Sequence, residues 1–219
     1  MIKLRTKNNL INNHGSTLIE MIVSFALLAI FLVSAATVIA SVTTMYYDVK
    51  GENYSKQVSD IVLNKIEAEI DGSVFVAGED ETNLRIQKAD DSEMGKTDTG
   101  ENINKGASVL LTDKTGTKVK IYRDPTDKDV VIHYFPIGTQ IETDWRFDQS
   151  VYNHFTVEEL TFMKASEVSS YSELSNYGID SVPDYGPDVI AVFLKIHSGR
   201  YGDYYAYRFV KMYNYSETP

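Results

Sequence analysis

The longest run of hydrophobic positions in the chain extends from residue 21 to residue 42 and contains no charged residue, proline or glycine. Its polar positions are all hydroxyl side chains, namely Ser24, Ser34, Thr37 and Ser41. As a helix rising 1.5 Å per residue, this run would be about 33 Å long, which matches a hydrocarbon core of about 30 Å. The pattern predicts one membrane-spanning helix, with Tyr46 and Tyr47 at its outer interface.

A second helical pattern follows Gly51, where hydrophobic residues recur three or four positions apart. These residues are Val58, Ile61, Val62, Ile66 and Ile70. Charged residues fall between them, so we expect one apolar face to pack against a soluble domain. The helix should end near Asp71 and Gly72. The two patterns together predict one long helix, and Gly51 is the position at which a bend would be expected.

Beyond residue 73 the pattern changes to short β-rich runs separated by turn residues. The expected strands are residues 83–88, 108–112, 118–123, 130–135, 157–163, 189–197 and 203–213. The runs between 108 and 135 predict an antiparallel meander, and the last two runs predict a hairpin. The fold class is therefore α+β, with a long amino-terminal helix packed on an antiparallel β-sheet head.

Two segments follow neither pattern. Residues 89–106 are rich in Asp, Glu, Lys, Gly and Asn, which predicts a surface loop. They lack the D-x-[DN]-x-[DN]-G series of a calcium loop, so a solvated acidic loop is favoured over a calcium site. Residues 166–187 are rich in Ser and Tyr, a composition that suits an interface and a sheet surface equally, and no binding site is assigned there.

Length and composition narrow the classes of function. The 219 residues suffice for one membrane segment and one soluble domain. A net charge of −10 repels nucleic acid, and the absence of cysteine excludes disulfides and thiolate metal sites. His133, His154 and His197 lack zinc-binding spacing, and no nucleophile-elbow or nucleotide-binding motif is present. We expect a protein that is not an enzyme and uses no metal and no cofactor.

The residues before the apolar run form a distinctive junction. Lys3, Arg5 and Lys7 precede Gly15, which Ser-Thr-Leu-Ile-Glu follows at positions 16–20. Basic residues on this side predict a cytoplasmic leader and an exported remainder. A secretory signal peptide is the alternative, because residues 33–35 offer small side chains for a signal peptidase. It would leave an acidic residue between the basic and apolar regions, which disfavours it.

Glu20 is the one acid beside the apolar run, and two roles are open for it. Thr17 and Glu20 have the S/T-x-x-E spacing of a capping box, in which each side chain accepts a hydrogen bond from an amide at the helix start. Capping alone would contribute about 1 kcal/mol of helix stability. An unpaired carboxylate beside hydrocarbon is costly, so Glu20 also needs a partner or water.

The junction resembles that of the type IV prepilin family, in which Thr-Leu-Ile-Glu follows a cleavable glycine and one further residue. Gly15, Thr17, Leu18, Ile19 and Glu20 match, whereas Ser16 stands where the family usually has phenylalanine or methionine. The resemblance implies cleavage between Gly15 and Ser16 by a prepilin peptidase and N-methylation of Ser16. It also implies a charge pair between Glu20 of one subunit and the Ser16 amine of its neighbour, and a helix followed by a β-rich head.

These observations predict four parts of the chain. They are a cleaved basic leader at 1–15, a transmembrane and assembly helix at 16–50, an amphipathic helix at 51–71 and a β-rich globular head at 72–219. Loss of the leader removes Lys3, Arg5 and Lys7, which changes the net charge from −10 to −13.

We expect a non-enzymatic structural subunit of a type IV pilus, similar to a minor pilin in its length and long inserts. The alternatives are a pseudopilin of a type II secretion or DNA-uptake machine, and a membrane-anchored surface-binding domain that does not polymerise. Expected partners are other pilin subunits, the prepilin peptidase, the assembly platform and, before assembly, membrane lipid, without direct nucleic acid binding. The expected location is the cytoplasmic membrane with the head outside, and then an extracellular pilus or pseudopilus.

Overall fold

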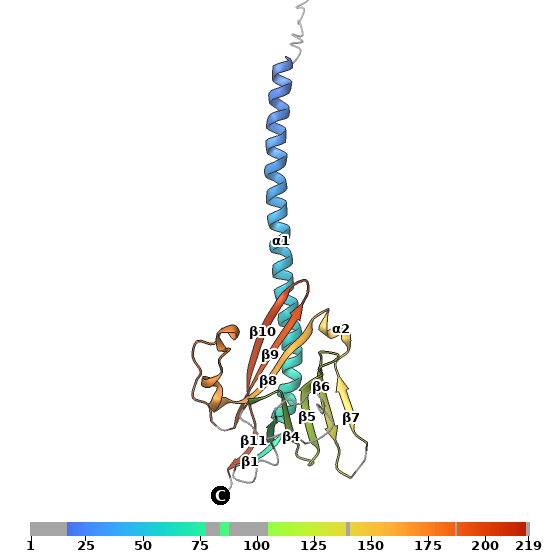
Figure 1. The fold of residues 1–219 in the computed structure, drawn as a ribbon, viewed down its shortest axis with the longest axis vertical. Coiled ribbons are helices and arrows are strands. Elements are labelled where there is room, and N and C mark those ends of the chain that lie inside the picture. The colour runs from blue at the N-terminus through green and yellow to red at the C-terminus, as the bar shows by residue number, and fades with distance from the viewer. Residues whose placement is uncertain (1–16, 78–83, 88–104, 139–140, 187, 218–219) are drawn as a thin grey trace, which may run out of the picture. The chain divides into compact units, whose positions relative to one another are not determined.

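The computed structural model describes residues 17–77, 84–87, 105–138, 141–186 and 188–217 (Figure 1). Contacts between residues divide the chain into two compact units, residues 1–47 and residues 48–219. We call them the apolar unit and the head unit and describe each by itself. Helix α1 (Leu18–Asp71) passes through the boundary between them.

Within the head unit, α1 contributes a stripe of buried side chains at four-residue spacing. Val58, Val62, Ile66 and Ile70 are at most 3% exposed, as the periodicity predicts. Ile61 was expected on the same face, but it is 45% exposed. It lies about 60° round the helix from Val58, at the margin of the stripe. Leu63, on the other side of the stripe, is buried instead.

Two glycines mark the head-unit part of α1. The chain remains helical through Gly51, where a Cβ atom would lie 2.4 Å from Cδ1 of Tyr201. Glycine at this position therefore permits a close approach between the helix and a tyrosine ring. The helix ends at Asp71 as predicted, and the amide of Gly72 donates to the carbonyl oxygen of Ala68 at 3.2 Å.

One antiparallel sheet of the head unit has the strand order β10-β9-β8-β3. Its strands are β3 (Lys105–Gly106), β8 (Thr156–Lys164), β9 (Val189–Ser198) and β10 (Gly202–Lys211). The predicted hairpin is confirmed, because β9 and β10 pair along ten residues from Val189↔Lys211 to Ser198↔Gly202. The expected loop at 89–106 ends earlier than predicted, since Lys105 and Gly106 pair with β8; residues 88–104 lie outside the described residues.

The other antiparallel sheet has the order β2-β4-β5-β6-β7. Its strands are β2 (Leu84–Gln87), β4 (Ser108–Thr112), β5 (Lys118–Arg123), β6 (Val130–Phe135) and β7 (Thr143–Arg146). The predicted meander is confirmed as β4-β5-β6. Strand β7 was not predicted, because its four half-exposed or exposed residues carry no hydrophobic alternation. A short helix, α2 (Gln149–Tyr152), follows it.

A two-stranded parallel pair joins the end of the chain to the segment after α1. Strand β1 (Val74–Ala77) pairs with β11 (Asn214–Glu217), from Val74↔Asn214 to Ala77↔Glu217. The sequence analysis missed both strands, because partners this distant in the chain leave no local pattern. The pairing fixes the last strand beside the point where α1 ends.

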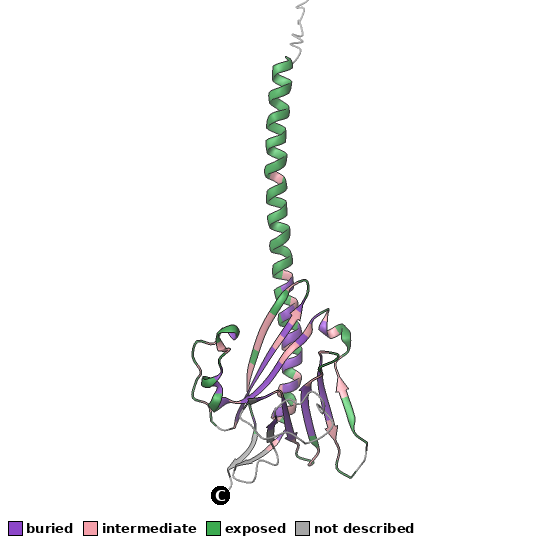
Figure 2. Ribbon diagram, in the orientation of Figure 1, coloured by how far each residue is buried: buried purple, intermediate pink, exposed green. Residues whose placement is uncertain are grey.

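The larger hydrophobic core unites the head-unit part of α1 with both antiparallel sheets (Figure 2). Its fully buried members include Val62 and Ile66 from α1, Ile121 from β5, and Val192 from β9. A helix with one apolar stripe can bury it only against other elements. The inner strands of both sheets therefore read as nearly continuous buried runs in β4, β5, β6 and β9.

A second, smaller core lies around Phe193 and takes its cover from the Ser- and Tyr-rich segment. Two 3-10 helices in that segment, η1 (Ala165–Ser170) and η2 (Leu174–Tyr177), bring Tyr171 and Tyr177 to 4.8 and 5.0 Å from the Phe193 ring. Both tyrosines are at most 6% exposed. The tyrosines of this segment that the structure buries thus pack within the head unit itself.

Gly106 lies where the two antiparallel sheets approach each other. It pairs with Phe162 of β8, and a Cβ atom on it would lie 2.1 Å from the carbonyl oxygen of Gln87 in β2. The neighbouring Ser108 hydroxyl donates to the Gln87 side chain. Because backbone atoms meet here, no side-chain rearrangement would make room for a methyl group.

A guanidinium group and three carboxylates hold the β5–β6 turn to β7. Arg146 donates to Asp124 at 2.6 Å, to Asp129 at 3.0 Å and to Asp127 at 3.0 Å. Burial alone would raise the pKa of Asp124, but hydrogen bonds from Arg146 and the amides of Thr126 and Asp127 outweigh it and lower the pKa. Burial also raises the pKa of Asp129, against the attraction of Arg146.

We predict that Gly106→Ala destabilises the head unit by about 2–3 kcal/mol, because the new methyl group must displace backbone. Thermal unfolding of the full chain in detergent micelles, followed by near-ultraviolet circular dichroism, measures the effect. Gly199→Ala is the matched control, since no atom of the described residues lies within 4 Å of a Cβ at that position. An equal loss of stability in both variants would contradict the close-approach argument.

We predict that Asp124→Asn destabilises the protein by about 1–2 kcal/mol at neutral pH, because it removes a charge-assisted hydrogen bond while keeping an acceptor for the turn amides. The folded-state pKa of Asp124 is lowered, so its contribution is present above the unfolded-state value of about 4 and is lost as pH falls through the folded value. The difference between variant and wild type should therefore shrink in acid.

Denaturant unfolding at a series of pH values tests this prediction. Asp127→Asn is the control, because its side chain contacts the same Arg146 but is 60% exposed, and exposed ion pairs contribute about 0–1 kcal/mol. A pH-independent difference for Asp124→Asn would show that the lowered pKa of Asp124 does not stabilise the fold.

Candidate functional site

The amino-terminal end of α1 carries the capping box that its sequence predicts. The amide of Thr17 donates to Oε2 of Glu20 at 2.8 Å, and the amide of Glu20 donates to Oγ1 of Thr17 at 3.3 Å. The carbonyl of Thr17 accepts from the amide of Met21 at 3.2 Å, which starts the helical ladder. Two of the free amides at the helix start are thus satisfied by side chains.

Glu20 has capacity for a further partner beyond this cap. A carboxylate offers about four acceptor positions, so a bond to Oε2 leaves Oε1 able to receive an ammonium group. Glu20 is also the only charged residue between positions 17 and 47. The acid lies in the first helical turn, where the helix dipole favours a negative charge. Gly15 and Ser16, the predicted cleavage and methylation residues, lie outside the described residues.

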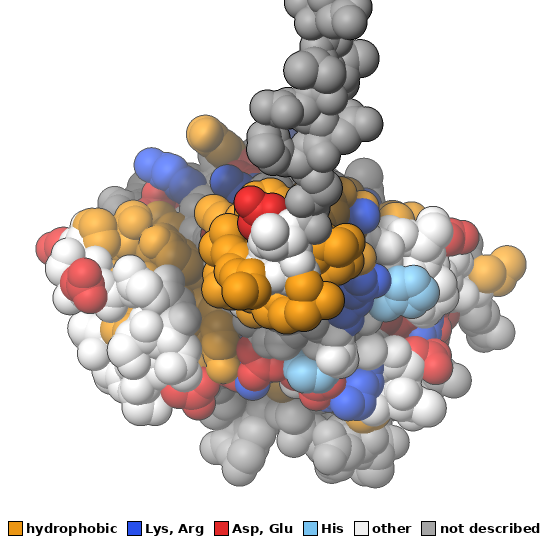
Figure 3. Space-filling view, turned by 90° about the horizontal axis from the view of Figure 1, so that it is seen from above, with side chains coloured by type: hydrophobic (Ala, Val, Ile, Leu, Met, Phe, Trp, Pro, Cys, Tyr) orange, Lys and Arg blue, Asp and Glu red, His pale blue; other side chains and the backbone are white. Residues whose placement is uncertain are grey.

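The side chains that follow Glu20 form an apolar surface on all sides of the helix (Figure 3). Ile19, Phe31 and Ile39 point outward in different directions and are all at least 65% exposed. The most hydrophobic part of α1 is not buried by the described residues, and it is long and apolar enough to cross a membrane. A helix that is apolar all round needs lipid or other helices around it.

Hydroxyl groups within the apolar unit donate to carbonyl oxygens of the same helix. Ser34 donates to Ile30 at 2.9 Å and Thr37 donates to Ser34 at 2.8 Å. Thr43 and Thr44 donate to the carbonyls one turn earlier, at 2.8 and 3.1 Å. These groups therefore enter an apolar environment with their donors satisfied, which removes most of the cost of burying them.

Two aromatic rings follow the apolar run. Tyr46 and Tyr47 lie edge to face with their ring centroids 5.7 Å apart, and both are exposed. The first charged residues after Glu20 come directly after them, at Asp48 and Lys50. Amphipathic rings at the end of an apolar helix suit the membrane interface, and the position of these two rings there stays a prediction.

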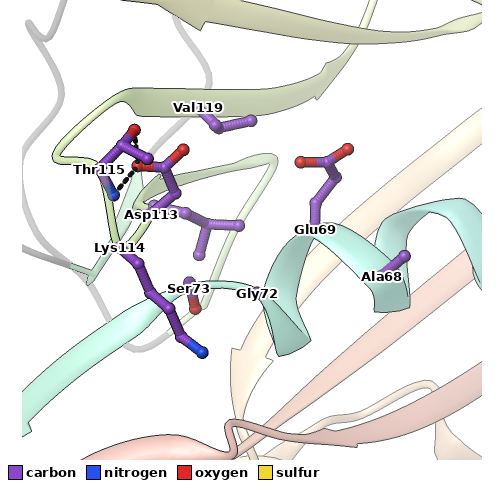
Figure 4. Close-up of a pocket in the computed structure, with 9 residues that line it drawn as sticks. Ala68, Glu69, Gly72, Ser73, Asp113, Lys114, Thr115 and Val119 are labelled. Carbon is purple, nitrogen blue, oxygen red and sulfur yellow. Dashed lines mark hydrogen bonds between the residues drawn. The ribbon is translucent and has the colours of Figure 1, made fainter. Parts of the chain in front are cut away.

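A hollow of about 330 Å³ lies where α1 ends against the β4–β5 turn (Figure 4). Its acidic groups already have partners. Asp113 accepts hydrogen bonds from the amides of Thr115 and Thr117, at 2.7 and 2.9 Å, and Glu69 accepts one from the hydroxyl of Tyr134 at 2.7 Å. These carboxylates stabilise the turn and the packing of β6 on α1, and we assign the hollow no function.

The three histidines of the head unit lie in separate places. His133 is buried, with one ring nitrogen beside Asp144 and the other 3.2 Å from Glu142. His197 lies 2.6 Å from Asp203, and His154 is exposed. The sequence analysis missed the His133–Asp144 pair, because it arises from the unpredicted pairing of β6 with β7. No group of three or more potential metal ligands occurs among the residues that the structure describes.

Residues 10–36 match the family model of the prokaryotic N-terminal methylation motif. No curated protein matches the chain in a sequence search. The matched interval contains Gly15, Ser16, the capping box and the first part of the apolar helix. The match supports the type IV pilin-like family and indicates a precursor that a prepilin peptidase processes. It also fits membrane anchoring of the apolar helix followed by pilus assembly.

Proposed function

We propose that this protein is a minor pilin, a non-enzymatic structural subunit of a type IV pilus. In this proposal the peptidase cuts between Gly15 and Ser16, the new Ser16 amine is methylated, and α1 carries the subunit from the membrane into the fibre. The leader is residues 1–15, the assembly helix 16–50, the amphipathic helix 51–71 and the head 72–219. The observation that carries the proposal is the capped Glu20 in front of an apolar helix, within the methylation motif.

The physical argument concerns what changes when the helix leaves the membrane. Lipid tails and neighbouring apolar helices are similar surroundings for residues 18–47, so the transfer brings little net hydrophobic free energy. A charge pair between Glu20 and the Ser16 amine of a neighbouring subunit does discriminate between positions along a fibre. Correct pairing neutralises two charges near hydrocarbon, and any other register leaves both unpaired. The pair therefore sets register.

The mature surface fits a structural role outside the cell. Removal of the leader changes the net charge from −10 to −13, which favours solubility of the head and repels nucleic acid. A pseudopilin of a secretion or DNA-uptake machine is the second candidate, because the methylation motif at 10–36 would serve it equally well. The length of the chain and its inserts between strands favour the minor pilin.

We predict that Glu20→Gln abolishes incorporation into filaments while leaving export and cleavage intact. Glutamine at this position of a capping box still accepts from the Thr17 amide, so the variant removes the charge and keeps the cap. Sheared filaments and membrane fractions are compared by immunoblotting, and peptide sequencing of the membrane fraction confirms the start at Ser16.

Thr17→Ala is the matched variant, because it removes the hydroxyl acceptor and keeps the Glu20 charge. It should cost about 1 kcal/mol at the helix start and leave incorporation largely unchanged. Normal incorporation of Glu20→Gln would contradict the charge-pair mechanism. A mature protein that begins at Met1 or at Ala36 would contradict the proposed function itself, in favour of an uncleaved anchor or ordinary secretion.

A further inference from the structure

A hollow of about 400 Å³ opens at the start of the head unit. Three separate parts of the chain line it. These are Lys50 and Tyr54 of α1, Asn153 and His154 after α2, and Ser198, Gly199, Arg200 and Tyr201 in and beside the β9–β10 turn. Figure 3 views the head unit from the side of this turn and shows Lys, Arg and His side chains gathered on part of that face.

The lining of this hollow is cationic in an otherwise acidic protein. Among the residues that the structure describes, the lining includes Lys50 and Arg200, together with His154, and no acidic residue, whereas the whole chain has a net charge of −10. An adjoining hollow of about 320 Å³ shares Arg200 and has the opposite character, with Asp48 and Asp203 in its lining. The positive potential is therefore confined to a pocket of limited size.

Each of the two cations lies over an aromatic ring. Lys50 Nζ lies 5.4 Å from the ring centroid of Tyr54, and Arg200 Cζ lies 5.4 Å from that of Tyr201. The two rings are 6.5 Å apart, and Phe155 stacks on Tyr201 at 6.0 Å. Gly51 allows the Tyr201 ring this position, because a Cβ atom there would collide with it. The hollow is thus a packed structure and not a chance gathering of surface lysines.

The chain itself limits how far this hollow can be from the membrane. Lys50 follows Tyr47 by three residues, which reach at most about 11 Å even when fully extended. The headgroup layer on each side of a bilayer is roughly 5–8 Å thick. If Tyr47 marks the outer edge of the span, the Lys50 ammonium lies at or beside the level of the lipid phosphates, whatever the orientation of the two units.

We propose that this hollow binds the phosphate group of an anionic phospholipid at the outer surface of the membrane, with Lys50 and Arg200 as the charged contacts. The proposal rests only on the membrane-held stage of the proposed function and does not depend on fibre assembly. The bound lipid would hold the head unit against the bilayer before the subunit is withdrawn. Release from that lipid would then be part of the work of assembly.

Charge and size favour a single headgroup over a longer polyanion. A nucleic acid or acidic polymer entering the hollow would extend past Arg200 and meet Asp48, Glu52 and Asp203 in the adjoining hollow. One phosphate group with a short glycerol substituent fits within the cationic lining and avoids those carboxylates. The tether to the span also supplies lipid headgroups at high local concentration.

Hydrogen exchange of the full chain in lipid nanodiscs tests the proposal. We expect amides of the β9–β10 turn at residues 198–202 to exchange roughly fivefold more slowly when phosphatidylglycerol is added to phosphatidylcholine, given the attraction expected per cation at an anionic surface. The double variant Lys50→Gln with Arg200→Gln should lose this effect. Lys114→Gln, which removes one positive charge at the β4–β5 turn, should keep it.

Three results would overturn the proposal. They are no slowing by phosphatidylglycerol, slowing that persists in the double variant, and equal slowing by inorganic phosphate with the protein in maltoside micelles, which would assign the hollow to free phosphate. Each leaves the proposed function intact, since cleavage at Ser16 and incorporation into filaments are measured separately. A chain that inserts into the membrane and shows lipid-dependent slowing of hydrogen exchange, but is never cleaved, would contradict the proposed function and leave the lipid site intact.

Discussion

The apolar surface of residues 18–47 is the constraint on which the rest of the molecule depends. The residues that the structure describes bury none of its large hydrophobic side chains, and its backbone and the hydroxyls of Ser34, Thr37, Thr43 and Thr44 are satisfied within the helix. The free energy of the helix is therefore similar in lipid and among other apolar helices. When two surroundings differ so little in hydrophobic free energy, the polar end of the helix decides between them. At that end the charged group is the carboxylate of Glu20, which the amide of Thr17 orients through a hydrogen bond.

The same helix meets a different requirement in the head unit. After Asp48 its apolar residues narrow to a stripe, and Val58, Val62, Ile66 and Ile70 pack into the core shared by both antiparallel sheets. A surface that is apolar all round suits a fluid environment without fixed partners, whereas a stripe specifies one face and one set of neighbours. The change in pattern along α1 thus separates the part that must exchange partners from the part that must keep them.

Local patterns predicted most of this fold, and non-local pairings account for the rest. The span, the stripe, the β4-β5-β6 meander, the β9–β10 hairpin and the capping box each depend on residues within one turn, one helix or adjacent strands. Strand β7 is too short for a pattern, β1 and β11 pair across the length of the head unit, and β3 has two residues. For the same reason the sequence did not reveal the hollow that joins Lys50 to Arg200, which are distant in the chain. Cleavage and methylation at Gly15 and Ser16 remain predictions, supported by the methylation motif.

Gly51 lies in α1 between the residues that are apolar on all sides and the buried stripe of the head unit. Glycine inside a helix costs about 1 kcal/mol relative to alanine, so its presence three residues after Asp48 needs a compensating gain. The gain is the Tyr201 ring, which lies against the helix backbone and is stacked on Phe155. This contact brings the β9–β10 turn to the first residues of the head unit. It therefore places the side chains of that turn, Arg200 included, beside the part of α1 that carries Lys50 and Tyr54. A larger residue at position 51 would favour the helix and displace the turn, so the glycine indicates that the position of the turn matters more than the local stability of the helix.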